Sequence, residues 1–430
     1  MNTAVILFLS FILFVLLGVP IAVSLGVSTI LALITTGMPL LVVAQRMFTS
    51  MDVFPLMAIP FFMLAGLLMQ TGGISRRLIG LANAIIGSLA GGLGLVSIAA
   101  SMFFAAISGS SPGTVSAIGT FMIPEMEKKG YGKEFSTALI ASSGTIGVII
   151  PPSIPMITYS VIAGTSIGTL FLAGIGAGII YGLALMLLTL FISKKRNYRG
   201  NAEAVSFKKV LNSFKESILA LLMPIIVLGG IYGGIFTPTE AAAVAVLYAF
   251  IIGVFVYKEI KIKDLPKIFL DSAVTAAVVM LIISTSSAFG WLLARERIPI
   301  MIAEWFLTIS ENPKIILLTI NILLLIVGTF METNAAIIIL APVFLPLITQ
   351  LGIDPIFFGL IVVVNLALGM CTPPLGVNLF VACGISKISI EDIVKEVWPF
   401  VLIMIFVLLF ITYVPSVSMF LPKVLMGYSF

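Results

Sequence analysis

Apolar segments separated by short polar turns occupy most of the chain. They fall at about 4–17, 20–36, 55–71, 91–108, 113–126, 134–165 and 168–192, and then at about 218–235, 238–256, 272–293, 314–330, 334–350, 355–385 and 394–420. A helix that crosses a bilayer needs about 20 mainly apolar residues, and several of these segments reach that length. The pattern predicts an all-α polytopic membrane protein in a lipid bilayer.

One long hydrophilic segment, 193–217, divides the chain nearly in half. Shorter amphipathic pieces lie near 40–50, 77–89, 262–271 and 299–310. The first apolar run has no basic residue before it and continues past Gly18 and Pro20, so we expect a retained helix pair with a break there, not a signal peptide.

We expect the two halves of the chain to contain matching helical elements. In residues 1–192 we expect scaffold helices (1–71), an arm (76–89), a re-entrant hairpin (91–126) and a broken helix (134–165). In residues 218–430 we expect scaffold (218–270), a hairpin (314–350), a broken helix (355–385) and a final helix (394–420).

An internal repeat supports this division. A constant shift of 222 residues aligns Pro124 with Pro346, Gly130 with Gly352, Phe135 with Phe357, Gly147 with Gly369, and Pro151-Pro152 with Pro373-Pro374. Glycine and proline determine backbone shape, so a repeat of these residues indicates a repeated structure.

Charge indicates how the halves are oriented. The segment 193–217 carries seven basic residues, which predicts a cytoplasmic location. Basic residues elsewhere fit the same rule if 91–126 and 314–350 each enter and leave the membrane on one side, and the halves are then inverted. Inverted repeats are a hallmark of secondary transporters.

Composition excludes several other functions. Only 10% of residues are charged and 60% are hydrophobic, with a mean hydropathy of +1.25, whereas soluble domains carry about 25% charged residues. The chain has no histidine, which removes Ser-His and Cys-His catalysis and histidine-bound metals. Its basic residues lie in short loops, which does not favour nucleic acid, and no GxxxxGK motif is present. We expect neither an enzyme nor an organic cofactor.

The first hairpin turns at Ser108-Gly109-Ser110-Ser111-Pro112-Gly113. Hydroxyl and freed carbonyl oxygens suit a hard cation such as Na⁺, and the N-terminus of the next half-helix offers N–H groups to an anion. The alternative is an ordinary Gly/Ser loop between two spans.

The second hairpin turns at 328–334, where Glu332 lies in an apolar region. A carboxylate at membrane depth costs about 2.5 kcal/mol or more, so it is usually paired or functional. Glu332 could orient the site, contact a polar substrate group or bind a cation less directly, or it could simply cap the next half-helix.

Double prolines interrupt the segments 142–153 and 365–374. A helix cannot keep its hydrogen bonds through such a pair, and irregular backbone at membrane depth is tolerated where it is buried in protein or lines a cavity. One unwound helix facing each hairpin tip predicts two pseudo-symmetric Na⁺ sites. The alternative is a pair of proline kinks without a ligand.

Two further charged positions have competing interpretations. Arg295 follows the apolar span 272–293 and could hold a substrate carboxylate, or it could anchor the helix end at the interface. Glu240, in the run TPTE, indicates a helix start capped by Thr237 or Thr239.

Four motifs together resemble the large membrane subunit of the tripartite ATP-independent periplasmic (TRAP) transporters: GIFTPTEAAAVAV (234–246), IGVIIPPSIPM (146–156), AISGSSPG (106–113) and METNAAIIILAPVFLP (331–346). The resemblance covers essentially the whole chain. It implies a multi-pass protein of the bacterial inner membrane with an elevator-type ion-transporter fold, driven by the sodium gradient. It also implies a small four-helix membrane partner, a periplasmic substrate-binding protein, and an organic-acid substrate such as sialic acid or a C4-dicarboxylate.

The resemblance also implies site residues. The candidate Na⁺ ligands are Ser108, Gly109, Ser110, Gly144, Gly147 and Pro151 at one site, and Gly328, Met331, Thr333, Gly369 and Thr372 at the other. The candidate substrate contacts are Ser111, Ser153, Arg295, Glu332, Asn334 and Asn378.

Two other functions compete with the TRAP subunit. A stand-alone carboxylate transporter with similar hairpins would work without a binding protein. An intramembrane serine protease would need a histidine base, which the chain lacks.

Overall fold

The computed structural model describes residues 3–200 and 206–429, and every regular element in them is helical. The first half contains α1 (Thr3–Leu16), α2 (Ile21–Thr36), α3 (Leu41–Met51), η1 (Phe54–Met57), α4 (Ala58–Thr71), α5 (Ile74–Ile86), α6 (Gly92–Ser108), α7 (Ser111–Lys128), α8 (Lys133–Gly144), η2 (Thr145–Val148), α9 (Ile154–Ala163) and α10 (Ile167–Lys195).

The second half begins with a helix pair and a π-helical turn before its longest helix. Its elements are α11 (Phe207–Tyr232), α12 (Pro238–Ile251), η3 (Ile252–Val256), η4 (Ile262–Asp264), α13 (Leu265–Arg295), α14 (Ile298–Ile309), α15 (Pro313–Phe330), α16 (Thr333–Gln350), α17 (Pro355–Gly369), α18 (Val377–Ser386), α19 (Ile390–Tyr413), α20 (Pro415–Ser418) and α21 (Phe420–Met426).

Eight helical segments of the described chain are long and apolar enough to cross a membrane, by length and composition. Seven shorter apolar helices accompany them. The prediction of an all-helical polytopic membrane protein is confirmed. The predicted apolar segments 134–165 and 355–385 each contain two short helices, because the double prolines interrupt them.

Three predicted boundaries are wrong. The linker between the halves is shorter than the predicted segment 193–217, because α10 continues to Lys195 and α11 already begins at Phe207. Residues 201–205 of that segment lie outside the described residues. Phe207, Val210, Leu211 and Phe214 recur at helical spacing, which explains the early start of α11. The piece 262–271 is not separate either, because η4 leads directly into α13, where Pro266 occupies a tolerated first-turn position. The final helix, expected over 394–420, is α19 followed by the short α20 and α21.

Two predicted local features are confirmed. The chain breaks between α1 and α2 at Gly18, whose φ of 77° requires glycine-like freedom, and Pro20 precedes α2. Thr237 caps α12: its hydroxyl accepts a hydrogen bond from the Glu240 backbone N–H, and the Glu240 carboxylate accepts one from the Thr237 N–H.

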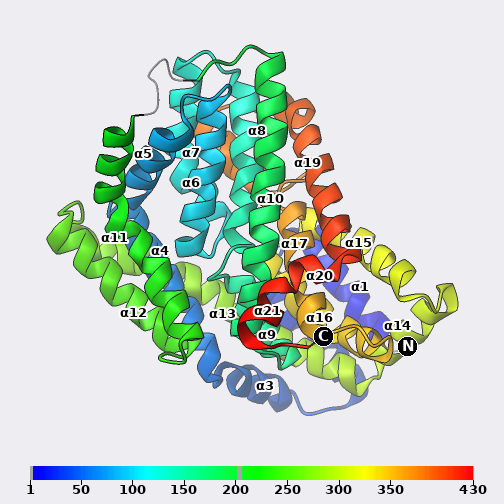
Figure 1. The fold of residues 1–430 in the computed structure, drawn as a ribbon. Helices are drawn as coiled ribbons and strands as arrows, with labels where there is room; N and C mark the ends of the chain where they lie inside the picture. Colours follow the sequence, from blue (N-terminus) through cyan, green and yellow to red (C-terminus); the bar gives the residue numbers. More distant parts are fainter. Residues whose placement is uncertain (1–2, 201–205, 430) are drawn as a thin grey trace.

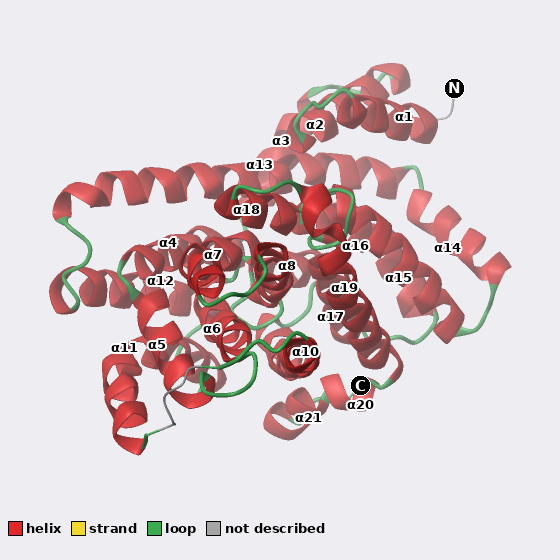
Figure 2. Ribbon diagram, turned by 90° about the horizontal axis from the view of Figure 1, so that it is seen from above, coloured by secondary structure: helices red, strands yellow, loops and turns green. Residues whose placement is uncertain are grey.

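The helices form a central bundle with two groups of helices around it. Helices α6, α7, α8 and α10 stand side by side in the centre of Figure 1, with α4, α5, α11 and α12 at one side. Seen from above, α13 lies along the molecule between this bundle and α1–α3, while α6, α8 and α10 are viewed end-on (Figure 2). The helix α13 therefore crosses the direction of the bundle and contacts α2, α3, α4 and α16.

The chain contains two helical hairpins. The first hairpin is α6 and α7, with residues 108–111 as its tip, and the second is α15 and α16, with residues 330–333 as its tip. The first broken helix consists of α8, η2 and α9, and the second of α17 and α18. Packing between the halves is reciprocal: α7 contacts α18, and α16 contacts α9. Each hairpin is thus supported by a half-helix from the other half of the chain.

Glycine allows each hairpin to approach a broken helix closely. A Cβ added at Gly369 would lie 2.6 Å from the Gly328 Cα, so α15 and α17 cross there backbone to backbone. Gly147 lies against the first tip, where its added Cβ would overlap the Ser110 carbonyl oxygen and the Thr114 hydroxyl. Both double prolines contain a cis peptide bond, Pro151-Pro152 and Pro373-Pro374. The aligned glycines of the two halves therefore serve the same packing purpose.

We expect Gly369→Ala to lower the free energy of unfolding by about 1–3 kcal/mol, because the neighbouring atoms are backbone and cannot move aside. The measurement is the thermal midpoint of the purified protein. The matched control is Gly384→Ala on α18, where nothing lies within 4 Å of an added Cβ. A Gly369→Ala variant that melts at or above the temperature of the Gly384→Ala control would contradict the proposed close crossing.

Candidate functional site

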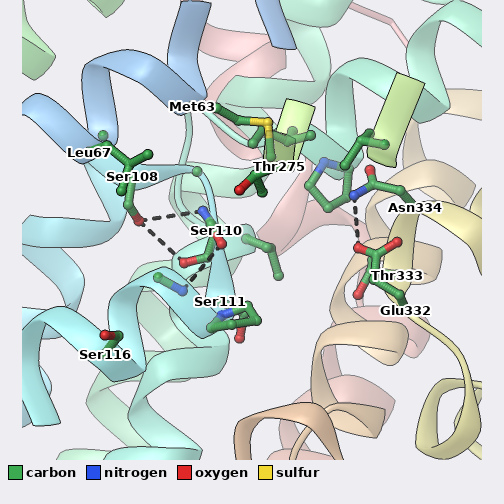
Figure 3. A pocket seen from close by; sticks show the side chains of 18 of the residues that line it. Met63, Leu67, Ser108, Ser110, Ser111, Ser116, Thr275, Glu332, Thr333 and Asn334 are labelled. Carbon is green, nitrogen blue, oxygen red and sulfur yellow. Dashed lines mark hydrogen bonds between the residues drawn. The ribbon is translucent and has the colours of Figure 1, made fainter. Parts of the chain in front are cut away.

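A cavity of about 670 Å³ lies between the two hairpin tips and helices α4 and α13. In Figure 3, Ser108, Ser110 and Ser111 lie on one side of it, Glu332 and Thr333 on the other, and Met63 and Thr275 along the wall between them. A volume of this size suits a small organic ligand, since such pockets range over about 300–1,000 Å³. The cavity is the candidate functional site.

The first tip concentrates oxygen atoms. The Ser108 Oγ lies 2.9 Å from the Thr114 Oγ1, and the Thr114 hydroxyl donates to the Ser110 carbonyl oxygen over 2.8 Å. Ser110 caps α7, because its Oγ accepts a hydrogen bond from the Gly113 N–H. The Ser111 hydroxyl donates to the Gly144 carbonyl at 3.0 Å, which joins the tip to the end of α8. Oxygen ligands of these kinds suit a hard cation.

The second tip is built around one carboxylate. Glu332 caps α16: its Oε2 accepts from the Ala335 N–H over 3.1 Å, and its Oε1 accepts from the Asn334 side-chain amide over 2.8 Å. Thr333 is buried, and its hydroxyl contacts the Met370 Sδ at 3.1 Å. The capping interpretation of Glu332 is therefore correct, and the same carboxylate also lines the cavity.

Hydrogen bonds connect each tip to the opposite half of the chain. The Asn378 amide on α18 donates to the Ser111 hydroxyl at 2.8 Å and to the Ala141 carbonyl at 3.0 Å. In the other half, the Thr158 hydroxyl on α9 donates to the Asn334 Oδ1 at 3.0 Å. Because all of these side chains are buried, each bond fixes a tip relative to a half-helix.

Backbone groups released at the breaks also pair with the tips. The Ile154 N–H, at the start of α9, donates to the Gly109 carbonyl at 3.4 Å. The Gly376 N–H, just before α18, donates to the Thr329 carbonyl at 3.3 Å. Each unwound segment therefore lies directly behind a tip.

The structure brings most of the predicted site residues together. The cavity wall includes Ser108, Gly109, Ser110, Ser111, Glu332, Thr333 and Asn334. The remaining candidate Na⁺ residues lie outside that wall, in the tips or in the broken helices behind them: Gly144, Gly147, Pro151, Gly328, Met331, Gly369 and Thr372.

Three predicted substrate contacts do not reach the cavity. Ser153 is fully buried as the cap of α9, and its hydroxyl donates to the Val148 carbonyl at 2.6 Å. Asn378 is buried behind the first tip, where it binds Ser111. Arg295 is exposed at the end of α13, with its Cζ 5.7 Å from the Trp291 ring centre. The prediction that these three residues line the substrate site with Glu332 is therefore corrected. Ser153 and Asn378 are used in hydrogen bonds within the protein, and the direction of α13 places Arg295 away from the tips.

Sequence reasoning missed the wall formed by α4 and α13. Gly66, Leu67 and Gln70 come from α4, and Val274 and Thr275 from α13. The sequence could have indicated Gln70 as a site residue, because it is the first polar residue after a long apolar run. Nothing in the sequence distinguishes Val274 and Thr275 from other residues of their helix. Thr114 and Thr158 were also missed, although Thr114 lies three residues after Ser111 and thus on the same helix face.

The charge distribution of the wall is unusual for an anion site. Among the described residues that line the cavity there is no lysine or arginine, and Glu332 is the charged one. Neutral donors, hydroxyl groups and the N-termini of α7 and α16 make up the rest of its polar surface. An anion here would have to be balanced by helix dipoles or by bound cations.

The fold is that of a polytopic membrane protein with an internal cavity, and comparison with known proteins identifies it as a transporter. The family profile of the tripartite ATP-independent periplasmic transporter, DctM component, matches residues 8–417. The chain belongs to this family of transporter permeases and is not an enzyme.

Several named relatives match along nearly the whole chain. The isethionate TRAP transporter permease protein DctMQ of Oleidesulfovibrio alaskensis is 49% identical over 96% of this chain, which spans 66% of that longer relative. The C4-dicarboxylate TRAP transporter large permease protein DctM of Rhodobacter capsulatus is 41% identical, with 98% and 99% of the two chains covered. The sialic acid TRAP transporter large permease protein SiaM of Vibrio cholerae is 39% identical, with 96% of both covered.

A solved structure shares the fold. The crystal structure of the YdaH transporter of Alcanivorax borkumensis superposes with a TM-score of 0.62 over 87% of both chains, at 14% sequence identity. At that identity the similarity concerns the fold alone.

We expect Thr158→Val to destabilise the purified protein by about 1–3 kcal/mol, because the buried Asn334 Oδ1 loses the donor seen here. The measurement is the thermal midpoint. Thr319→Val is the matched control, since the Thr319 hydroxyl is exposed and donates only to the Ile315 carbonyl of its own helix. Equal midpoints for the two variants would show that the bond between α9 and the second tip contributes nothing.

Proposed function

We propose that this chain is the membrane permease through which a TRAP system imports a small organic anion, driven by the sodium gradient. The observation that carries the proposal is the cavity lined by two hairpin tips, each packed against an unwound helix of the chain. Discontinuous helices of this kind form substrate and ion sites in secondary transporters. The family of the chain supports the same function.

Two Na⁺ sites fit the two tips. The first would use oxygens clustered around Ser108, Ser110 and Thr114, together with the carbonyl groups of the break near Gly144 and Gly147. The second would use Gly328, Met331 and Thr333 with Gly369 and Thr372, where the hairpin crosses the second broken helix. The proposed ligand atoms at both sites are oxygens, which suit a hard cation such as Na⁺.

We propose inverted-topology repeats and an elevator movement. The reciprocal contacts α7 with α18 and α16 with α9 support a pseudo-two-fold relation between the halves. Residues of both hairpin tips and residues of α4 and α13 line the cavity together, so a body carrying the tips could slide past these helices. In this arrangement α4, α11, α12 and α13 belong to the fixed scaffold, and the segment 193–217 faces the cytoplasm of an inner-membrane protein.

The proposed partners are a small membrane subunit and a periplasmic substrate-binding protein. DctMQ, the relative with 49% identity, is longer than this chain, and its name combines the M and Q components. That name supports a small membrane subunit as a component of the system. The relatives' names place the substrate among organic anions: isethionate, C4-dicarboxylates and sialic acid.

The defining experiment is uptake of labelled anion into proteoliposomes that contain this chain, its small subunit and the binding protein. We expect uptake that requires an inward sodium gradient and stops when any component is omitted. Isethionate, succinate and sialic acid would be tested separately. Uptake by this chain alone would instead establish a stand-alone carboxylate transporter, and uptake that persists in potassium would exclude sodium coupling.

We expect Ser108→Ala to raise the sodium concentration needed for half-maximal uptake by roughly tenfold, because the proposed site would lose one of its oxygen ligands and about 1.4 kcal/mol of lost binding is a factor of ten. Ser116→Ala is the matched control: Ser116 lines the same cavity but lies five residues beyond Ser111, where α7 begins, and is not among the proposed Na⁺ ligands. An unchanged sodium dependence in Ser108→Ala, with normal protein yield, would remove Ser108 from the site.

A further inference from the structure

One face of α4 forms part of the cavity wall and passes close to the first hairpin tip. The lining residues of α4 recur at spacings of three and four, so they form a single stripe along the helix: Met63, Gly66, Leu67 and Gln70. A Cβ added at Gly66 would lie 3.4 Å from the Ser108 Cα, and Leu67 lies beside Ser108 in Figure 3. Gln70 therefore follows one helical turn after the contact between α4 and the tip.

Gln70 brings an unpaired polar group to a part of the wall that is otherwise almost entirely apolar. Among the described lining residues of α4 and α13, Thr275 is the other polar one, and its hydroxyl already donates to the Asp271 carbonyl at 2.7 Å. Gln70 is half-buried, and its amide makes no hydrogen bond within the described residues. Because an amide carries two N–H donors and one acceptor oxygen, the side chain is available to a ligand in the cavity.

Most hydroxyl hydrogens at the first tip are already used within the protein. The Ser111 hydroxyl donates to a carbonyl at the end of α8, and the Thr114 hydroxyl donates to the Ser110 carbonyl. The Ser108 hydroxyl lies 3.3 Å from the same carbonyl oxygen. No lysine or arginine is present among the described lining residues. An anion at this tip would therefore rely on the N-terminus of α7 and on donors from the facing wall, where Gln70 lies.

We propose that Gln70 is a substrate-binding residue. Its side-chain amide donates hydrogen bonds to the carboxylate or sulfonate group of an organic anion that is held against the first tip. This inference rests on the proposed function, since it names a further contact for the ligand of the same cavity. The contact is neutral, so it does not depend on the protonation of any side chain in the wall.

The position of Gln70 on α4 gives this contact a further consequence. In the proposed elevator movement α4 belongs to the scaffold, whereas the first tip belongs to the moving body. A ligand that touches both Gln70 and the tip therefore bridges the two bodies, and it must release Gln70 before the tip can move along α4. Gln70 strengthens binding in the conformation seen here.

The test is equilibrium binding of labelled isethionate, succinate and sialic acid, in sodium at neutral pH, to the purified protein with its proposed small subunit. Gln70→Leu removes the amide at similar volume. We expect the affinity for every anion that binds the wild-type protein to fall roughly tenfold, as for the loss of a hydrogen bond to a charged group. Gln70→Glu replaces the N–H donors with acceptor oxygens and should weaken binding further. Thermal midpoints without anion should match the wild type in both variants.

Thr71→Val is the matched control. Thr71 is the next residue of α4 and lies at the same end of the helix, but it is exposed and outside the cavity wall. Its hydroxyl donates only to the Leu67 carbonyl of its own helix. An equal loss of affinity in Thr71→Val and Gln70→Leu would show that any change at this helix end disturbs binding, and would overturn the proposed contact.

Two further outcomes separate this inference from the proposed function. If the wild-type protein binds an anion and both Gln70 variants bind it with unchanged affinity, Gln70 is excluded as a contact while the proposed function stands. If the wild-type protein shows no sodium-dependent binding of any of the three anions, the proposed function fails, and this inference fails with it.

Discussion

Backbone hydrogen bonding at membrane depth is the constraint on which this structure depends. An unpaired N–H or C=O in a bilayer costs several kcal/mol, so a helix can unwind there only where other protein groups satisfy it. Here the hairpin tips take that role: the Gly109 carbonyl receives the Ile154 N–H, and the Thr329 carbonyl receives the Gly376 N–H. Each tip needs a break and each break needs a tip, which explains why both occur twice.

The close contact between each hairpin and a broken helix also limits which residues can lie where the two backbones meet. The tips reach the breaks only because Gly147, Gly328 and Gly369 have no side chain to separate them. Once the backbones are that close, small polar side chains such as Ser111 and Thr158 can reach across to the other half of the chain. The oxygen-rich surroundings of the tips are therefore a consequence of close backbone packing as well as of the choice of serine and threonine.

Much of this arrangement could be predicted from the sequence, because proline and glycine act through local backbone geometry. The double prolines marked both breaks, and the 222-residue shift related them. What could not be predicted depends on how distant helices cross. Nothing local shows that Asn378 would lie behind the first tip, or that α13 would turn Arg295 away from the cavity. Ser153 misled for a related reason: a serine near a break can cap the next half-helix as readily as face a ligand.

The pseudo-symmetry of the backbone and the asymmetry of the caps have separate consequences. A repeated fold supplies two equivalent breaks, and so two comparable places for a cation. Glu332 caps the second half-helix with a carboxylate, whereas Ser110 caps the first with a hydroxyl. This one difference is enough to make the two ends of the cavity chemically distinct. Because the start of α16 and the Asn334 side chain hold Glu332 in place, this difference between the two ends is present before any ligand binds. The two ends of the cavity therefore differ through the positions of two capping residues, without a basic side chain in its described wall.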